Sequence, residues 1–163
     1  MPPTSHAPRN LQEEIGKVTA FDCPEQEAFL NLIRTHAGLA GEFAQLFKEF
    51  ALSEPQYNAL RIVAAAGARG IRTEAIGDRM VARDPDTTRL IDRLVKAGLV
   101  SRTRSEEDRR CVLVGITDEG RQLLRRLRPR VDRMHRQQLG HLDPRELERL
   151  SELLFRARHP STG

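Results

Sequence analysis

The sequence predicts a mainly α-helical protein with a small β-hairpin and long helices toward both ends. Aromatic residues make up only 4% of the 163 residues and there is no tryptophan, so the core has to be built from aliphatic side chains, as in packed helices. Most of the chain carries apolar residues at helical spacings behind helix-capping signals. The exception is the stretch 99–116, where two short strand-like runs flank a polar segment, the pattern of a hairpin.

Residues 1–23 are predicted to form an N-terminal tail that contains a short helix at 11–17. A long amphipathic helix is predicted over 24–50. Pro24 suits its first turn, and Glu25 and Glu27 suit the positive end of its dipole. One face of this helix is apolar, formed by Phe29, Ile33, Ala40, Phe43, Phe47 and Phe50.

Three shorter helices are predicted in the middle of the chain. Ser-Glu-Pro-Gln at 53–56 is a capping box that begins a helix ending near Gly67. Thr73 is predicted to cap a second helix over 74–81, and a three-residue turn at 82–84 follows. Asp84 is predicted to cap the third helix, which Gly98 ends in a left-handed conformation.

The strand-like runs 99–104 and 111–116 predict a β-hairpin around the charged segment 105–110. Thr117 then caps a long amphipathic helix, and Asp-Pro-Arg-Glu at 143–146 begins a last helix that reaches residue 158. Residues 159–163 form a C-terminal tail. The order of helix, short helix, turn, helix and hairpin is that of a winged helix-turn-helix, here predicted over 53–116.

A winged helix-turn-helix places the start of its last helix against base edges in the major groove of DNA. Thr87, Thr88 and Arg89 are therefore the predicted base contacts, since hydroxyls and a guanidinium match base edges. Arg93 and Thr73 are predicted to meet phosphate oxygens. The alternative is an ordinary surface helix, on which Arg89 and Arg93 are solvated or paired to nearby aspartates.

The hairpin adds four arginines directly after this helix, at 102, 104, 109 and 110. A purely structural hairpin rarely needs four guanidinium groups, so Arg104, Arg109 and Arg110 are predicted DNA contacts. Three acidic residues at 106–108 oppose them. We interpret Asp108 as a brace that orients Arg109 or Arg110 by a charge-assisted hydrogen bond.

These segments resemble the MarR family of bacterial transcription regulators. The resemblance lies in TRLIDRLVKAGLV at 88–100, DRR at 108–110 in the hairpin, ITDEG at 116–120 and LSEPQYNAL at 52–60, and it covers about residues 25–158. It implies a homodimer that binds double-stranded DNA at a pseudo-palindromic operator, as a ligand- or stress-responsive repressor, with activation left open. It also implies DNA contact by Thr87, Thr88, Arg89 and Arg110, with Asp108 as the brace.

One feature of this chain departs from the family pattern. Acidic residues at 84 and 86 flank the predicted DNA-facing turn. We expect Asp86 to discriminate against wrong bases or to accept from cytosine N4.

The family takes small aromatic or phenolic acids, or oxidants, as effectors. The sequence does not choose between them, although Phe43, Phe47 and Tyr57 either wall an apolar pocket or belong to the core.

Dimerisation is also expected from the apolar surface of the terminal helices, 24–52 and 117–158. A three-helix winged core cannot cover all of it, and a two-fold partner can bury it in an isologous interface. The alternative is that these helices pack on their own domain. A second alternative function also stays open, a winged-helix module that binds another protein and does not read DNA.

Charge supports the nucleic-acid interpretation. Residues 1–68 hold 5 Lys/Arg and 8 Asp/Glu, a net of −3, whereas residues 69–110 hold 11 and 8 and residues 111–163 hold 11 and 7, giving +3 and +4. The basic excess therefore begins at the predicted DNA-binding segment.

Other classes find little support. Five histidines show no metal-ligand spacing, and no Gly-rich phosphate loop occurs, so we expect neither an enzyme nor a bound metal or cofactor. No apolar run of 18 residues and no signal-peptide pattern occurs, so we expect a cytoplasmic protein. Cys23 and Cys111 are either ordinary thiols or redox-sensitive ones. The arginines before Cys111 would favour its thiolate.

Overall fold

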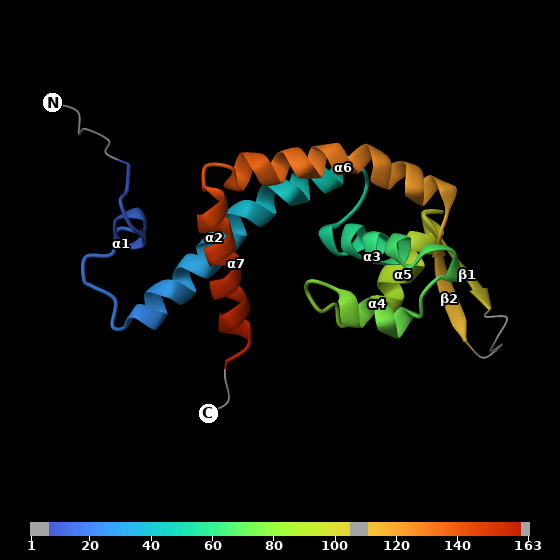
Figure 1. Ribbon diagram of the computed structural model, residues 1–163, viewed down its shortest axis with the longest axis horizontal. Helices are drawn as coiled ribbons and strands as arrows, with labels where there is room; N and C mark the ends of the chain where they lie inside the picture. Colours follow the sequence, from blue (N-terminus) through green and yellow to red (C-terminus); the bar gives the residue numbers. More distant parts are fainter. Residues whose placement is uncertain (1–6, 105–110, 161–163) are drawn as a thin grey trace. The chain divides into compact units, whose positions relative to one another are not determined.

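Figure 1 shows the computed structural model of the protein, which describes residues 7–104 and 111–160. Packing divides the chain into two compact units, residues 1–42 and 43–163. The predicted fold class is confirmed: the chain is mainly helical with one two-stranded antiparallel hairpin. The elements are α1 (Leu11–Glu14), α2 (Pro24–Lys48), α3 (Glu54–Ala65), η1 (Gly67–Arg69), α4 (Thr73–Arg79), α5 (Thr87–Lys96), β1 (Val100–Arg104), β2 (Val112–Ile116), α6 (Asp118–Leu139) and α7 (Pro144–Arg158).

The first unit holds α1 and most of α2. The Asn10 side chain caps α1 by accepting from the backbone N–H of Glu13. The helix is shorter than the predicted 11–17, because Ile15 already leaves the helical conformation. An ion pair of 2.7 Å between Arg34 and Glu14 joins α2 to α1. The predicted apolar face of α2 is open here, since 60% of Phe29 is exposed.

The capping box that begins α3 is confirmed. The Ser53 hydroxyl accepts from the Gln56 N–H, and the Gln56 side chain accepts in return from the Ser53 N–H. This reciprocal pair satisfies two donors that the first turn of a helix leaves free. The inner face of α3, which includes Leu60 and Val63, is fully buried, so α3 forms the centre of the winged domain.

The helix-turn-helix is present, but two boundaries differ from the prediction. Thr73 is the first residue of α4 and not its cap, because Arg72 is the extended residue before the helix and makes no side-chain cap. The helix also ends early, at Arg79, where Met80 takes an extended conformation. The connection to α5 therefore spans residues 80–86, longer than the predicted three-residue turn.

The start of α5 is the second correction. Asp86, and not Asp84, is the N-cap of α5, because its carboxylate accepts from the Arg89 N–H at 3.0 Å. Asp84 instead accepts from the Asp86 N–H at 2.8 Å and so closes the turn ahead of the helix. The predicted end of the helix is confirmed, since Gly98 has a φ of 71° in the left-handed region.

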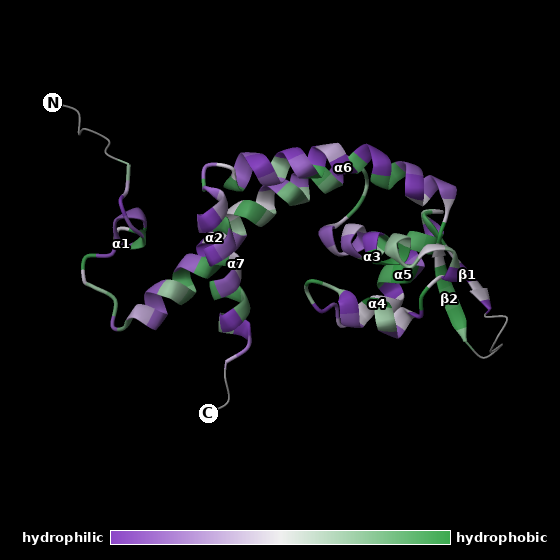
Figure 2. Ribbon diagram, in the orientation of Figure 1, coloured by the Kyte–Doolittle hydropathy of each residue, from purple (hydrophilic) through white to green (hydrophobic). Residues whose placement is uncertain are grey.

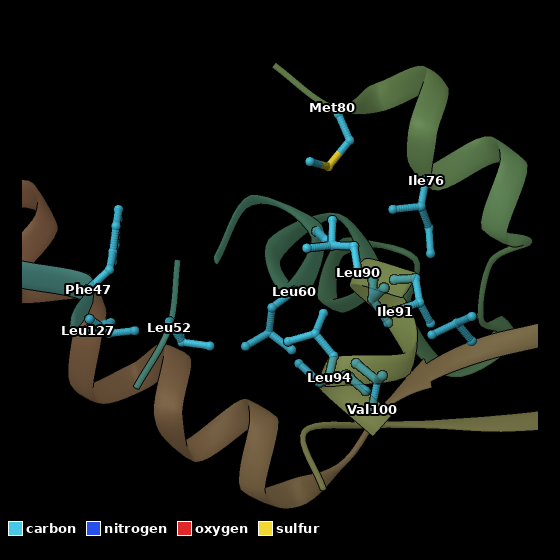
Figure 3. Close-up of a cluster of buried hydrophobic side chains, with 14 of the residues drawn as sticks. Phe47, Leu52, Leu60, Ile76, Met80, Leu90, Ile91, Leu94, Val100 and Leu127 are labelled. Carbon is cyan, nitrogen blue, oxygen red and sulfur yellow. The ribbon is translucent and has the colours of Figure 1, made fainter. Parts of the chain in front are cut away.

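The core lies between α3, α4, α5 and the hairpin (Figure 3). Each helix contributes apolar residues one turn apart, and together they remove most of their surface from water, the main source of stability in such a domain. The buried set continues along α6 toward the end of α2. Its members are Leu46, Phe47, Leu52, Ala59, Leu60, Val63, Ile71, Ile76, Met80, Leu90, Ile91, Leu94, Val100, Val114, Ile116, Leu127 and Val131.

The hairpin pairs Val100 with Ile116 and Arg104 with Val112 at its two ends. Ile71 adds an antiparallel bridge to Val114, which ties the start of α4 to the hairpin. The preceding Gly70 has a φ of 68°, and a Cβ there would lie 3.1 Å from the Val114 carbonyl oxygen. The left-handed conformation therefore favours glycine here, and a side chain would also be crowded at this approach.

Helix α6 begins against the hairpin and α5. Thr117 caps it as predicted, accepting from the Gly120 N–H while its own hydroxyl donates to the Gly98 carbonyl at 2.8 Å. A Cβ on Gly120 would overlap the carbonyl oxygen of Leu99. The start of α6 is thus packed directly on the backbone that ends α5.

Helix α7 has the predicted capping box at Asp143 and Glu146. No residue of α7 is buried within the described chain, and Leu150, Leu153 and Phe155 are 38%, 45% and 57% exposed. Figure 2 shows apolar segments alternating with polar ones along this helix. Its apolar stripe is therefore uncovered in the single chain.

The described helices are each too short or too polar to cross a lipid bilayer.

Candidate nucleic-acid interface

The two faces of α5 differ sharply. Leu90, Ile91 and Leu94 are buried against the core, with 4%, 0% and 0% of their surface exposed. Thr88, Arg89 and Arg93, all predicted DNA contacts, lie on the exposed side of the same helix. The packing of the apolar face thus presents these three polar side chains to solvent together.

Thr87 differs from its predicted neighbours. It is half-buried, its hydroxyl donates to the Asp84 carbonyl at 3.2 Å, and a Cβ placed on Gly77 of α4 would lie 3.1 Å from that hydroxyl oxygen. Its proton is therefore used within the turn, so toward DNA this hydroxyl can only accept. Base contact by Thr87 stays a prediction.

Arg89 and Asp86 form one unit at the start of α5. The Asp86 carboxylate accepts from the Arg89 backbone N–H through Oδ1 and pairs with the Arg89 Nε through Oδ2 at 3.1 Å. The pairing that the sequence left as an alternative for Arg89 is therefore present. Its shortest contact is through Nε, and neither terminal amino group of the guanidinium makes a hydrogen bond to a described residue.

The hairpin arginines do not all face outward in the same way. Arg102 on β1 donates to Asp92 of α5 at 2.5 Å, which joins the hairpin to α5. Arg104, at the end of β1, is exposed. The remaining predicted wing contacts, Asp108, Arg109 and Arg110, lie outside the described residues.

Thr73 is half-buried at the first position of α4. The neighbouring Arg72 is exposed, and its Nη2 donates to the Cys111 sulfur at 2.6 Å. Cys111 thus has an arginine beside it, although a different one from those the sequence suggested.

The exposed Cys23 lies at the start of α2, where hydrogen bonds from the Glu25 backbone and the Cys23 thiol lower the pKa of the Glu25 carboxyl. Redox sensitivity of either thiol stays a hypothesis.

One support for the helix-turn-helix was not expected from the sequence. The Asn58 side chain on α3 accepts from the Val81 backbone N–H at 2.9 Å, so α3 holds the connection between α4 and α5. Asn58 is a polar residue beside the apolar face of α3, which was visible in the sequence. Nothing in the sequence near Asn58 indicated that its partner is Val81.

A groove of about 380 Å³ lies apart from this surface, between α3 and α6. Tyr57 is the one member of the predicted aromatic set that lines it, whereas Phe47 is buried in the core and stacks on Tyr57 at 4.6 Å. Two arginines and one aspartate give the groove a positive balance. The lining residues are Tyr57, Arg61, Ala64, Leu124, Arg128 and Asp132.

An exposed polar helix face, a buried apolar face and an adjoining hairpin define the class of winged helix-turn-helix proteins. The MarR family model matches residues 52–112. The HTH-type transcriptional regulator YfiV of Bacillus subtilis is 33% identical over 120 residues, 74% of this chain and 72% of that protein. The transcriptional repressor MprA of Escherichia coli is 26% identical over 66% of this chain and 62% of its own length.

A crystal structure of a MarR transcription factor from Planctomyces limnophilus is 44% identical to this chain. It aligns with a TM-score of 0.64 over 83% of this chain and 98% of that one. The protein therefore belongs to the MarR family of DNA-binding transcriptional regulators.

Proposed function

We propose that the protein is a homodimeric transcriptional repressor that binds a pseudo-palindromic operator and is released by a small-molecule effector. Residues 53–116 of each subunit would read one half-site, and the helices at 24–52 and 117–158 would form the dimer. The exposed side of α5 carries this proposal, because Thr88, Arg89 and Arg93 lie together on it beside the wing.

Base reading is assigned to the first turn of α5 and backbone contact to its surroundings. Arg89 has the reach and the donors for guanine O6 and N7, and the Thr88 hydroxyl can donate to or accept from a base edge. Arg93 and Arg104, both exposed, and Thr73 at the start of α4 suit phosphate oxygens, which position a protein without reading sequence.

Dimer formation is supported by the apolar side chains that the single chain leaves exposed. Leu150 and Leu153 of α7 and Phe29 and Ile33 of α2 are each more than a third exposed. A two-fold partner would bury such surfaces and would set the distance between the two recognition helices. That distance has to be about 34–36 Å to match one turn of B-DNA.

Repression is proposed because the relative MprA is a transcriptional repressor. A repressor that covers a promoter needs only tight operator binding and a means of release. Selection of bound fragments from random DNA by the purified protein tests the operator part directly. A symmetric consensus with half-sites one helical turn apart is expected, and recovery of random sequence would contradict the proposal.

The competing function, a winged-helix module for a protein partner, differs in its salt dependence. A dimer that neutralises about 8 phosphates should lose roughly 10³–10⁵ in affinity between 50 and 200 mM salt. A protein partner would show a much flatter response. Arg89→Ala should in addition lose discrimination at one or two base pairs, at a cost of about 1–3 kcal/mol.

The groove between α3 and α6 is the proposed effector site. The Tyr57 ring offers a stacking face, and Arg61 lies 5.9 Å from the centre of this ring. Arg128 adds a second cation, held at 3.9 Å from Asp132. This combination suits an aromatic carboxylate. Among proteins of the same fold, the structure of BpsR of Bordetella bronchiseptica is described as showing regulation of its DNA binding by 6-hydroxynicotinic acid, an aromatic carboxylate.

Release would follow if the effector favours one placement of α6 against α3, since only a difference in affinity between two states shifts their populations. Calorimetric titration with benzoate and hydroxybenzoates, with Arg61→Ala and Arg128→Ala as variants, tests the site. We expect binding that weakens in both variants and that lowers operator affinity. Equal binding by all three proteins would exclude this groove.

A further inference from the structure

The ion pair between Asp86 and Arg89 has no evident structural purpose. The Arg89 and Asp86 side chains are 79% and 46% exposed, and exposed pairs of this kind contribute little to stability. The cap of α5 needs only the Oδ1 of Asp86. A serine or asparagine would cap the helix as well. The charge suits the positive end of the helix dipole, but the dipole does not require the second oxygen to pair with Arg89.

The geometry indicates which donors of Arg89 are free. A guanidinium has five N–H donors in one plane. The Nε of Arg89 lies 3.1 Å from Oδ2 of Asp86 in an ion pair, which holds the Nε side of the group toward the carboxylate. Within the described residues, the four donors on the two terminal nitrogens make no hydrogen bond. Two parallel donors at the end of a guanidinium match the O6 and N7 acceptors of guanine.

The negative charge also matters to the alternatives that Arg89 has on DNA. A free arginine binds any phosphate, and such contacts carry no sequence information. Asp86 lies next to the guanidinium and would be brought toward the phosphates in the same movement, so each phosphate contact is opposed by like charge. A guanine edge carries no net charge and is not opposed in this way.

We propose, on the basis of the function proposed above, that Asp86 is a positioning residue that makes Arg89 specific for guanine. It holds the guanidinium at Nε, leaves the terminal donors for O6 and N7, and suppresses phosphate contacts by its charge. The chain thereby gives up non-specific affinity in exchange for discrimination. Asp86 thus acts through Arg89 and does not itself read a base.

The test compares full-length wild-type protein with Asp86→Asn and Asp86→Ser. Both substitutions keep a capping side chain, and unchanged thermal unfolding would show that α5 is intact. Binding is measured to the selected operator and to random duplex DNA across a salt series. The matched control is Asp118→Asn, because Asp118 pairs with the Nε of Arg121 at 3.2 Å with the same three-residue spacing at the start of α6.

We expect the ratio of operator to random affinity to fall by about a hundredfold in both Asp86 variants, about tenfold for the one contact in each subunit of the dimer, through tighter random binding. The salt slope of random binding should steepen by about 1.8, the increment for two more phosphates. Replacing the contacted guanine by 7-deazaguanine removes N7 and should weaken the wild type more than Asp86→Asn. Asp118→Asn should leave the ratio unchanged.

The possible failures can be told apart. If the wild type does not prefer any site over random DNA, the proposed function itself fails. If the wild type discriminates and both Asp86 variants discriminate equally well, only the role of Asp86 is overturned. A loss of ratio that Asp118→Asn reproduces would assign the effect to net charge and would also overturn the proposal.

Discussion

Helices α5 and α7 have similar sequence patterns, but their apolar faces differ in burial. Each begins behind a capping aspartate, carries arginines, and has one apolar face. In α5 that face is covered, since Ile91 and Leu94 have no exposed surface, whereas in α7 no residue is buried within the described chain. An amphipathic pattern therefore shows that a face needs a cover, and it leaves open whether the same chain supplies it.

The largest effect is expected where the cover comes from the chain itself. Leu94→Ala removes a fully buried side chain from the core of the winged domain and should lower the free energy of unfolding by about 2–5 kcal/mol. Denaturant unfolding measures it, and the loss should be the same at every protein concentration. If the loss in free energy varied with protein concentration, the apolar face of α5 would also be covered by a second protein chain.

For α7 we expect substitutions to affect dimer formation and not the stability of the winged domain. Leu150→Arg combined with Leu153→Arg should produce monomers with an intact winged domain. Operator affinity should fall by about 10²-fold or more, because two linked heads bind far more tightly than one. Sedimentation and circular dichroism check the two parts. Glu148→Arg, on the opposite face of α7, is the control. A dimer that survives the double substitution would show that α7 is not at the interface.

A smaller effect is expected at the link between α5 and the wing. Arg102→Ala removes the contact to Asp92, a partly exposed pair worth about 0.2–1 kcal/mol, and should lower operator affinity a few-fold by loosening the wing. The exchange Arg102→Asp with Asp92→Arg should restore most of it. If Arg102→Ala costs as much when Asp92 is already Asn, then Arg102 meets DNA directly.

The smallest expected change is a gain. A Cβ on Gly38, within α2, would meet no atom within 4 Å, so Gly38→Ala should stabilise the protein by up to about 1 kcal/mol through helix propensity alone. Thermal unfolding of the full-length protein measures it. Destabilisation would indicate that a partner chain packs closely on α2 at this position, which would sharpen the contrast with α5.

The sequence was sufficient for the fold because its signals are local. The capping box at Ser53, the left-handed Gly98 and the Thr117 cap all lie within a few residues of their partners, and each is confirmed. The predicted start of a helix was wrong where two neighbouring residues could each cap it. Asp84 and Asp86 are equally good caps by residue type, and only the turn that Asp84 closes decides for Asp86.

The candidate site was predictable in its position and not in its internal pairing. The helical period places Thr88, Arg89 and Arg93 on one side of α5 as soon as the apolar face is known. The Arg102 contact to Asp92 and the Asn58 contact to Val81 join residues 10 and 23 positions apart. Such contacts depend on how elements pack, for which a single sequence carries no local signal.

The seam at Gly120 has a mechanical consequence. Since a methyl group cannot fit between Gly120 and the Leu99 carbonyl, and Thr117 bonds to Gly98 across the same seam, the end of α5 and the start of α6 have no room to slide. At 1.5 Å per residue α6 is about 33 Å long. Because the two helix ends are held together, a tilt of a few degrees at the distant end of α6 would change the orientation of α5 and of its exposed face with Thr88, Arg89 and Arg93.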